Sequence, residues 1–201
     1  MSKCYNLLTI SDNNIDELLH NPPLIWRILA PDSQDLYLNA INDKNHKSLL
    51  TRWFHKNDAA VVTEAPNLEF IEGEGIDVEL DKSWHGIHYL LTKSAWSGDW
   101  PLNFLLCEGK EIGDIDIGYG PARTFKANEV KEIAAALATI DHDALKENFD
   151  PGDMAHQDIY PDIWLNQLDD ALAYCLEYFD ELKRHVNDAA QRNMGLLVHL
   201  S

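Results

Sequence analysis

Cysteine is scarce in this sequence, and its placement argues against both disulfides and metal clusters. The three cysteines, Cys4, Cys107 and Cys175, are far apart and odd in number. No C-x-x-C pair and no Cys/His spacing typical of a zinc site occurs. Each cysteine lies in an apolar stretch, where small thiols are usually buried. We therefore expect a reducing, cytoplasmic location and no bound metal or cofactor.

Positive charge is also in short supply. Lys and Arg number 16 against 34 Asp and Glu, which gives a formal net charge of −18. Nucleic-acid binding depends on cations that displace condensed counterions, and anionic membranes attract basic segments, so both partners are disfavoured. Acidity alone can simply aid solubility. Recognition of a basic protein partner is the other interpretation, and the sequence leaves both open.

Long hydrophobic runs are missing. No segment approaches the length of apolar chain needed to cross a bilayer. The segment Met1–Asn14 has one lysine and too short an apolar run for a signal peptide. Hydrophobic residues at 45% and charged residues at 25% are ordinary globular values. Because no repeat or low-complexity linker divides the 201 residues, we expect a single domain covering 1–201.

Recognisable catalytic motifs are absent too. The sequence contains no G-x-S-x-G elbow, no H-E-x-x-H pair, no phosphate-cradling loop and no G-x-G-x-x-G turn. No cysteine is accompanied by a recognisable catalytic His signature. Whether the protein is an enzyme therefore stays open at the level of sequence.

Hydrophobic periodicity in the first part of the chain predicts short elements. A strand should be followed by a helix that carries Ile15, Leu18 and Leu19 on one side and stops at Pro22-Pro23. Ser11 or Asp12 is the expected N-cap. Two further short helices and a region of surface strands or loops should follow. The strand is expected at Cys4–Ile10 and the two further helices at Leu36–Ile41 and Lys47–His55. The surface region is expected at Asn57–Leu80.

The middle of the chain contains a more regular pattern. Asp81 is a suitable N-cap for a helix that presents Trp84, Ile87, His88 and Leu91 on one face. Pro101 suits the first turn of another helix, with Leu102, Leu105 and Leu106 inward and Gly109 at its end. The glycine-rich segment Gly113–Phe125 then leads into an amphipathic helix with Val130, Ile133, Leu137 and Ile140.

The last part predicts the longest element. Asp141 or Asp143 should cap a short helix that stops before Pro151. A long helix from about Ile163 to Arg192 should follow, because apolar residues alternate steps of four and three along it. Gly195 should end this helix and Leu196–Leu200 should form a closing strand. The expected fold is α+β, with a small mixed or antiparallel sheet and several packed helices. The apolar residues that form a stripe along the expected long helix are Leu168, Leu172, Cys175, Phe179, Leu182, Val186 and Ala189.

Three motifs indicate a family. The segments Asp81–Thr92, Gly118–Arg123 and Tyr160–Trp164 resemble, in order and spacing, the YfbM-like family of bacterial proteins of unknown function. The resemblance is clearest from about Ile76 to Leu200. It implies a mixed α/β domain with a small sheet and several packed helices. It implies no substrate, cofactor or catalytic residue.

The first motif places several polar side chains on one side of a helix. Asp81, His85, His88 and Thr92 follow at i, i+4, i+7 and i+11. One carboxylate and two imidazoles could hold a metal or form a proton relay. The structural interpretation is that Asp81 caps the helix and the histidines are hydrogen-bonded in an aromatic core beside Trp84. We favour the structural interpretation.

The second motif is a tight glycine turn. Gly118 and Gly120 permit backbone angles closed to other residues, and Pro121 stiffens the exit. Such a turn could present amides to an anion, with Arg123 as a forked donor. The alternative is that Arg123 braces the turn through a carboxylate or backbone carbonyls. We favour bracing.

The candidate cluster combines these motifs with aromatic side chains of unknown exposure. It comprises Trp84, His85, His88, Tyr119, Arg123, Tyr160 and Trp164; Trp96 and Trp100 add further aromatic surface. Exposed, these rings would form a binding patch; buried, they would be core. The leading hypothesis is a non-catalytic acidic module that recognises a basic protein partner. The alternative is a small-molecule-binding protein or enzyme with a pocket lined by His85, His88, Tyr119 and Arg123.

Overall fold

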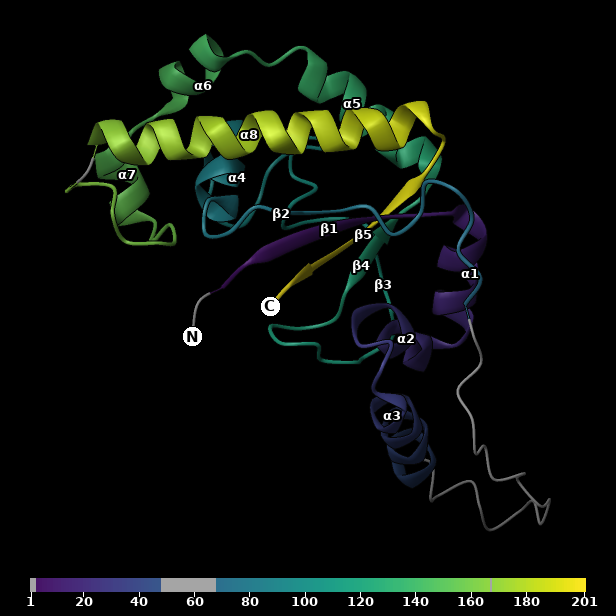
Figure 1. Ribbon diagram of the computed structural model, residues 1–201. Coiled ribbons are helices and arrows are strands. Elements are labelled where there is room, and N and C mark those ends of the chain that lie inside the picture. Colours follow the sequence, from purple (N-terminus) through teal and green to yellow (C-terminus); the bar gives the residue numbers. More distant parts are fainter. Residues whose placement is uncertain (1–2, 48–67, 167) are drawn as a thin grey trace, which may run out of the picture.

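Five short strands form one antiparallel sheet. They are β1 (Tyr5–Ile10), β2 (Asp77–Glu79), β3 (Lys110–Glu111), β4 (Arg123–Phe125) and β5 (Gly195–Leu200). The computed structural model in Figure 1 describes residues 3–47, 68–166 and 168–201. Within these ranges the strands lie in the order β2-β1-β5-β4-β3, and every pairing is antiparallel. The first and last strands of the chain are therefore neighbours at the centre of the sheet.

Helices surround this sheet and account for most of the regular structure. They are α1 (Asp12–His20), the 3-10 turn η1 (Pro22–Leu24), α2 (Ile25–Leu29), α3 (Gln34–Lys47), α4 (Trp84–Thr92), α5 (Ala127–Ala138), α6 (His142–Asn148), α7 (Pro151–His156) and α8 (Leu168–Gln191). Figure 1 shows α8 running across one face of the sheet with α4 and α5 beside it, whereas α1, α2 and α3 lie at the other side. The fold is α+β, as the sequence predicts.

Side chains of the central strands point alternately to the two faces of the sheet, and each face packs into its own hydrophobic core. Tyr5 and Leu7 point to the face covered by α4, α5 and α8. Ile10, from the opposite face of the same strand, packs with Ile15 and Leu18 of α1. Because successive strand residues face opposite sides, one strand serves both layers.

The long helix is confirmed, with a later start than expected. α8 begins at Leu168, since residues 160–166 form separate turns in which the Ile163 N–H donates to the Pro161 carbonyl. The side chain of Leu168 lies outside the described set, and Leu172 is half-buried. The remainder of the predicted stripe is buried: Cys175, Phe179, Leu182, Val186 and Ala189.

Gly195 does not end α8, which corrects the sequence-based expectation. Asn193 takes the left-handed conformation after the helix, with φ of 57°. Gly195 is instead the first residue of β5, where a Cβ would lie 2.5 Å from the Phe125 carbonyl oxygen and 2.6 Å from Ile15 Cδ1. Its role is close approach between elements rather than helix termination.

Asp81 does not cap α4 either. The helix begins at Trp84 after Ser83, and Asp81 lies outside it with φ of 42°. The Asp81 carboxylate instead accepts a hydrogen bond of 2.7 Å from the Tyr174 hydroxyl of α8. A tertiary partner has therefore replaced the local capping interaction.

The elements near the N-terminus follow the prediction only in part: the first strand and α1 form, whereas η1 and α2 were not expected and α3 is longer than the predicted helix. Ser11 caps α1 by accepting the Asn14 N–H. The predicted helix Leu36–Ile41 lies inside α3. The predicted helix Lys47–His55 falls outside the described residues except for Lys47, which closes α3. Of Asn57–Leu80 only residues 68–80 are described, and they contain β2.

Asp141 caps α6 as predicted, and Pro151 opens a helix that the sequence analysis did not anticipate. The Asp141 carboxylate accepts the Ala144 N–H, and α6 ends before Pro151. Asp150 then caps α7, which begins at Pro151. Proline suits this first position because its missing N–H would have no partner there.

Candidate binding cleft

A cleft of about 300 Å³ opens where three distant segments meet. α4 supplies Trp84 and His85, the loop after α4 supplies Trp96, and the segment after α7 supplies Tyr160. Lys3, immediately before β1, completes the wall. The cleft therefore depends on the central position of β1, which brings the start of the chain to α4.

Stacked rings form the floor and one wall of this cleft. Trp84 lies against His85 with ring centroids 4.8 Å apart and 5° between the planes, and against Tyr160 at 5.9 Å. Trp96 covers His85 from outside at 4.5 Å. Trp84 is 1% exposed and Trp96 is 64% exposed. Trp84 is thus core, whereas Trp96 offers an aromatic face to solvent.

His85 is held by two hydrogen bonds that define its tautomer. Its Nδ1 accepts the backbone N–H of Tyr160 at 3.0 Å, so Nε2 carries the proton and donates to the Ala95 carbonyl at 2.8 Å. Burial lowers the pKa of His85, and the positive charge of Lys3 lowers it further. The neutral imidazole therefore serves as a structural link between two loops.

Lys3 places a cation against the aromatic wall. Its ammonium nitrogen lies 5.1 Å from the ring centroid of Tyr119 and 5.7 Å from that of Tyr160. The backbone holds this position, because the Trp84 indole N–H donates to the Lys3 carbonyl at 3.1 Å. Tyr119, which is 42% exposed, thus joins the edge of the cleft through Lys3.

Two carboxylates stand at the mouth of the cleft. Asp158 and Asp162 both line it and are both exposed. Neither forms an ion pair with a residue in the described part of the chain. The cleft therefore combines exposed aromatic surface with two carboxylates against the single cation of Lys3.

His88 lies in the interior behind this cleft and does not line it. It is 0% exposed, and neither ring nitrogen has a hydrogen-bond partner among the described residues. Burial and the neighbouring His85 lower the pKa of His88 to about 4. The two histidines of the motif thus have different environments, and they do not converge on one metal position.

Arg123 braces backbone, as we favoured from the sequence, but the braced segment is the loop at 104–108 and not the glycine turn. Its guanidinium, which projects from β4, donates to the Tyr5 hydroxyl at 3.1 Å and to four backbone carbonyls at 2.6–3.2 Å. The carbonyls are those of Phe104, Leu105, Cys107 and Glu108. Arg123 therefore has protein acceptors and does not wait for an anionic ligand.

The same contacts explain why the turns after Pro101 do not continue as a helix to Gly109, which the sequence predicted. Residues 101–106 make consecutive turns instead. Because the carbonyls of Phe104 and Leu105 point toward Arg123, they are directed away from the amides that a continuing helix would supply. Gly109 does take a positive φ of 75°, but it ends a turn rather than a helix.

The glycine turn satisfies its own amides. The carboxylate of Asp116 accepts the N–H groups of Gly118 at 2.9 Å and Gly120 at 3.0 Å. These two bonds hold the pKa of Asp116 below its usual range. The anion that the turn could have bound is therefore supplied by the chain itself.

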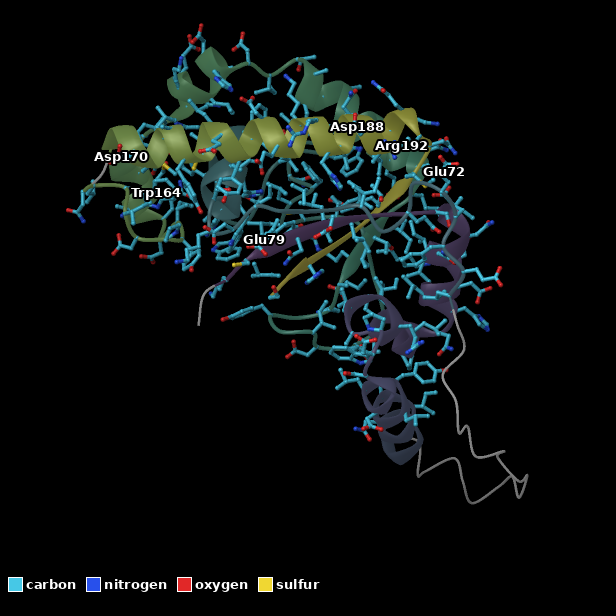
Figure 2. The ribbon with its side chains drawn as sticks, in the orientation of Figure 1. Glu72, Glu79, Trp164, Asp170, Asp188 and Arg192 are labelled. Atoms are coloured by element: carbon cyan, nitrogen blue, oxygen red, sulfur yellow. The ribbon has the colours of Figure 1, made fainter. Side chains whose placement is uncertain are left out.

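Trp164 is a core residue away from the cleft. It is 0% exposed, and its indole N–H donates to the Ile159 carbonyl at 2.6 Å. Its ring lies where a Cβ on Gly86 would come within 2.5 Å. Figure 2 places Trp164 beneath the beginning of α8. Of the predicted cluster, the structure brings together Trp84, His85, Tyr160 and the edge residue Tyr119.

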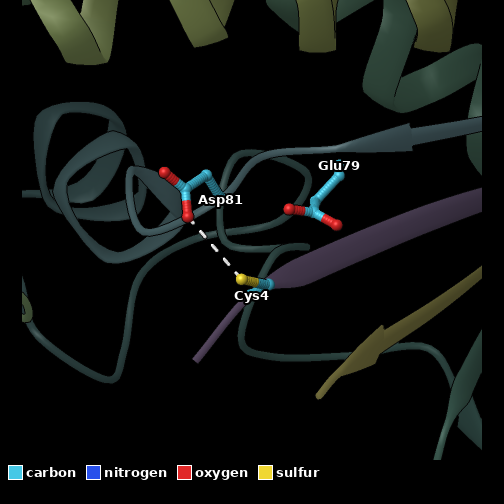
Figure 3. Close-up of side chains that lie close together, drawn as sticks. All are labelled: Cys4, Glu79 and Asp81. Atoms are coloured by element: carbon cyan, nitrogen blue, oxygen red, sulfur yellow. Dashed lines mark hydrogen bonds between the residues drawn. The ribbon is translucent and has the colours of Figure 1, made fainter. Parts of the chain in front are cut away.

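A separate group of side chains has the composition of a metal site. Ligand atoms of Cys4, Glu79 and Asp81 lie within 4.8 Å of one another. Figure 3 shows the three side chains close together. The Cys4 thiol already donates to Asp81 at 3.6 Å, and Tyr174 donates to the other carboxylate oxygen. Glu79 is exposed. Exposed acidic groups commonly lie close together in so acidic a chain, so this geometry does not by itself assign a metal.

Sequence reasoning missed the residues that complete the cleft. Lys3 and Asp158 come from segments without recognisable motifs. Asp162 belongs to the Tyr160–Trp164 motif but was not singled out, and only the folded chain unites the three residues. The closest signal was local, because Asp158 and Asp162 flank Tyr160, the first residue of that motif. Trp96 was noted only as aromatic surface of unknown exposure.

Purified protein is expected to contain no stoichiometric zinc at His85 or His88. Both nitrogens of His85 are already bonded, and metal binding would require Nδ1 or Nε2 to be released. Elemental analysis of metal-equilibrated protein, repeated after His85→Gln and His88→Gln, tests this. About one zinc per chain that either substitution removes would contradict the structural role.

The protein should become less stable as the pH is lowered, in part because of His88. Between its ordinary value of 6.5 and about 4, the unfolded chain binds a proton that the folded His88 does not. The free energy of unfolding should therefore decrease as pH falls through this window, by on the order of 2–3 kcal/mol from this residue. In urea unfolding at pH 7 and pH 4.5, His88→Leu should lose less stability than the wild type. Equal losses would show that His88 is not responsible.

Within the described residues, no helix has the length and hydropathy required to cross a membrane. All three cysteines are described, and none is in a disulfide. Burial raises the pKa of the Cys175 thiol to about 12, so this thiol is neutral at physiological pH.

Comparison with known proteins identifies the fold but no activity. The structure resembles the crystal structure of YfbM from Escherichia coli, a protein of unknown function, with a TM-score of 0.63. The alignment covers 98% of this chain and 99% of YfbM at 14% sequence identity, so the likeness concerns the fold. No curated protein matches the sequence. A family model described as "Domain of unknown function (DUF1877)" matches residues 1–199, and the chain belongs to that family.

Proposed function

We propose that the chain is a non-catalytic, cytoplasmic binding protein that recognises a basic protein partner through the aromatic cleft. The observation that carries this proposal is the position of Lys3. Its ammonium lies against the rings of Tyr119 and Tyr160 at the edge of the cleft. Aromatic faces attract cations through the ring quadrupole. The same cleft leaves the exposed ring of Trp96 open to a Lys or Arg side chain of a partner.

The charge of the chain supports a basic partner. Asp158 and Asp162 add local negative charge at the mouth, and the whole chain has a formal net charge of −18. Complementary charge accelerates encounter and disfavours wrong partners. Long-range attraction would therefore guide a basic surface to the protein, and the cleft would then select one of its side chains.

The polar groups near the cleft favour binding over catalysis. His85 has both nitrogens engaged, and its lowered pKa keeps the ring neutral. Arg123 directs its donors to protein carbonyls and to Tyr5. The alternative pocket of His85, His88, Tyr119 and Arg123 therefore has less support, because only His85 of the four lines the cleft.

A charge-matched pair of double variants tests the proposal. The cleft variant is Asp158→Asn with Asp162→Asn. The control is Asp32→Asn with Asp114→Asn, which makes the same charge change at exposed residues that do not line the cleft. The ligand is a glycine-spaced peptide with one Lys and one Arg, and NMR titration measures its dissociation constant. The cleft variant should bind about fivefold more weakly than the wild type, because it loses both mouth charges.

The control double variant should bind within about twofold of the wild type, because only long-range attraction changes. Equal weakening in the two variants would mean that the peptide senses net charge alone, and the cleft would not be its site. No saturable binding to the wild type would remove the proposal altogether.

A further inference from the structure

We infer that the cleft takes a guanidinium, so that the partner's recognised side chain is an arginine. This inference rests on the proposed function and names the group that binds. Its starting point is Trp96, which at 64% has the greatest exposure among the large hydrophobic side chains of the described residues. One face of its indole is supported by His85 at 4.5 Å. The exposed indole surface lies beside the mouth of the cleft.

The aromatic rings at the edge of the cleft already bind one ammonium group, that of Lys3. Lys3 lies over Tyr119 and Tyr160, and its own backbone holds it there through Trp84. A second ammonium at the same rings would meet this positive charge directly. The surface that stays available to a cation is therefore the indole of Trp96 together with the two mouth carboxylates.

A guanidinium fits this remaining surface better than an ammonium does. It is planar, so it can stack on the indole of Trp96 while its edge donates forked hydrogen bonds to Asp158 or Asp162. Tryptophan is the strongest aromatic partner for cations, and arginine uses such faces more often than lysine. Lysine instead presents a strongly hydrated point charge that cannot stack and fork together.

The source of the guanidinium is a protein surface. The cleft holds about 300 Å³, which is the lower limit of ordinary small-molecule pockets and suits a single side chain. The net charge of −18 extends well beyond the two mouth residues. A partner with further basic residues would gain from that wider field, whereas an isolated small cation would gain little.

Three pentapeptides test this inference on the full-length chain. They carry Arg, Lys or citrulline at the centre of Gly-Gly-X-Gly-Gly with blocked ends, and citrulline keeps the shape of arginine without its charge. NMR titration of the ¹⁵N-labelled protein follows the indole signal of Trp96. The arginine peptide should bind at least about threefold more tightly than the lysine peptide and at least about tenfold more tightly than the citrulline peptide.

A substitution separates the role of the indole from general charge. Trp96→Leu should abolish the preference for arginine over lysine, while Leu165→Ala, at another exposed apolar residue, should leave it unchanged. Thermal unfolding confirms that both variants remain folded. An arginine preference that survives Trp96→Leu would overturn the inference.

The remaining outcomes distinguish the inference from the function on which it rests. Equal binding of the arginine and lysine peptides, both tighter than citrulline, would overturn the guanidinium while leaving a basic partner. Failure of all three peptides to bind would overturn both. A further peptide, with lysines in place of the glycines around the arginine, that bound no more tightly than N-acetylarginine amide would overturn the protein source.

Discussion

Arg123→Lys is expected to lower the free energy of unfolding by roughly 2–4 kcal/mol, because lysine cannot satisfy the acceptors that the guanidinium now satisfies. Those acceptors are the Tyr5 hydroxyl and the carbonyls of Phe104, Leu105, Cys107 and Glu108. An ammonium keeps the charge but has three donors on one atom, so it cannot span all five positions. Urea unfolding at pH 7 measures the difference.

The control for this change is Arg184→Lys on the exposed face of α8. It should alter stability by no more than about 0.5 kcal/mol, the usual range for surface substitutions. If Arg123→Lys also stays within that range, the loop at 101–108 does not depend on the guanidinium. The explanation for its lack of helix would then fail as well.

Phe179→Ala should cost roughly 3–5 kcal/mol, the range for large-to-small changes of a buried aromatic residue. Phe179 is 1% exposed in the core between α8 and the sheet. Removal of its ring loses the burial of that surface and leaves a cavity that a long, regular helix cannot readily close. Leu172→Ala should cost less, because Leu172 is only half-buried.

Glu177→Ala is the matched control, since Glu177 lies on the exposed side of the same helix. Urea unfolding of the three variants should give the order Phe179→Ala, Leu172→Ala, Glu177→Ala, from the largest loss to the smallest. A loss at Phe179 no larger than that at Glu177 would mean that α8 does not bury its stripe in solution.

Helices and strands whose own residues show a clear hydrophobic periodicity could be predicted from the sequence. α8 and β1 carry their burial pattern in consecutive residues, so their existence and inward faces follow from local information. The pairing of β1 with β5 could not be predicted in this way. The two strands lie at opposite ends of the chain, and no local pattern specifies which strand will lie beside which.

Two of the wrong predictions have a shared physical cause. At Pro101 the apolar spacing favoured a helix, but Arg123 captures the carbonyls that the helix would use. At Asp81 the carboxylate suited a cap, but Tyr174 of α8 binds it instead. In both cases a partner distant in sequence competes with a local backbone interaction, and only the folded chain shows which one prevails.

The candidate cleft was predictable only in part. His85 and Tyr160 were singled out from their motifs, and a hydrogen bond of 3.0 Å joins them. Lys3 and Trp96 complete the surface from segments that carry no motif. A short motif can thus mark a wall of a cleft, but the opposite wall depends on tertiary structure.

We propose that function resides in the aromatic cleft rather than in the glycine turn or the buried histidine. The most direct measurement is NMR chemical-shift mapping of the labelled chain with the arginine pentapeptide. We expect saturable shifts at the Trp96 indole and at the amides of 155–162, with little change around His88. Saturable shifts confined to Gly118–Arg123, or to any surface away from the cleft, would contradict it.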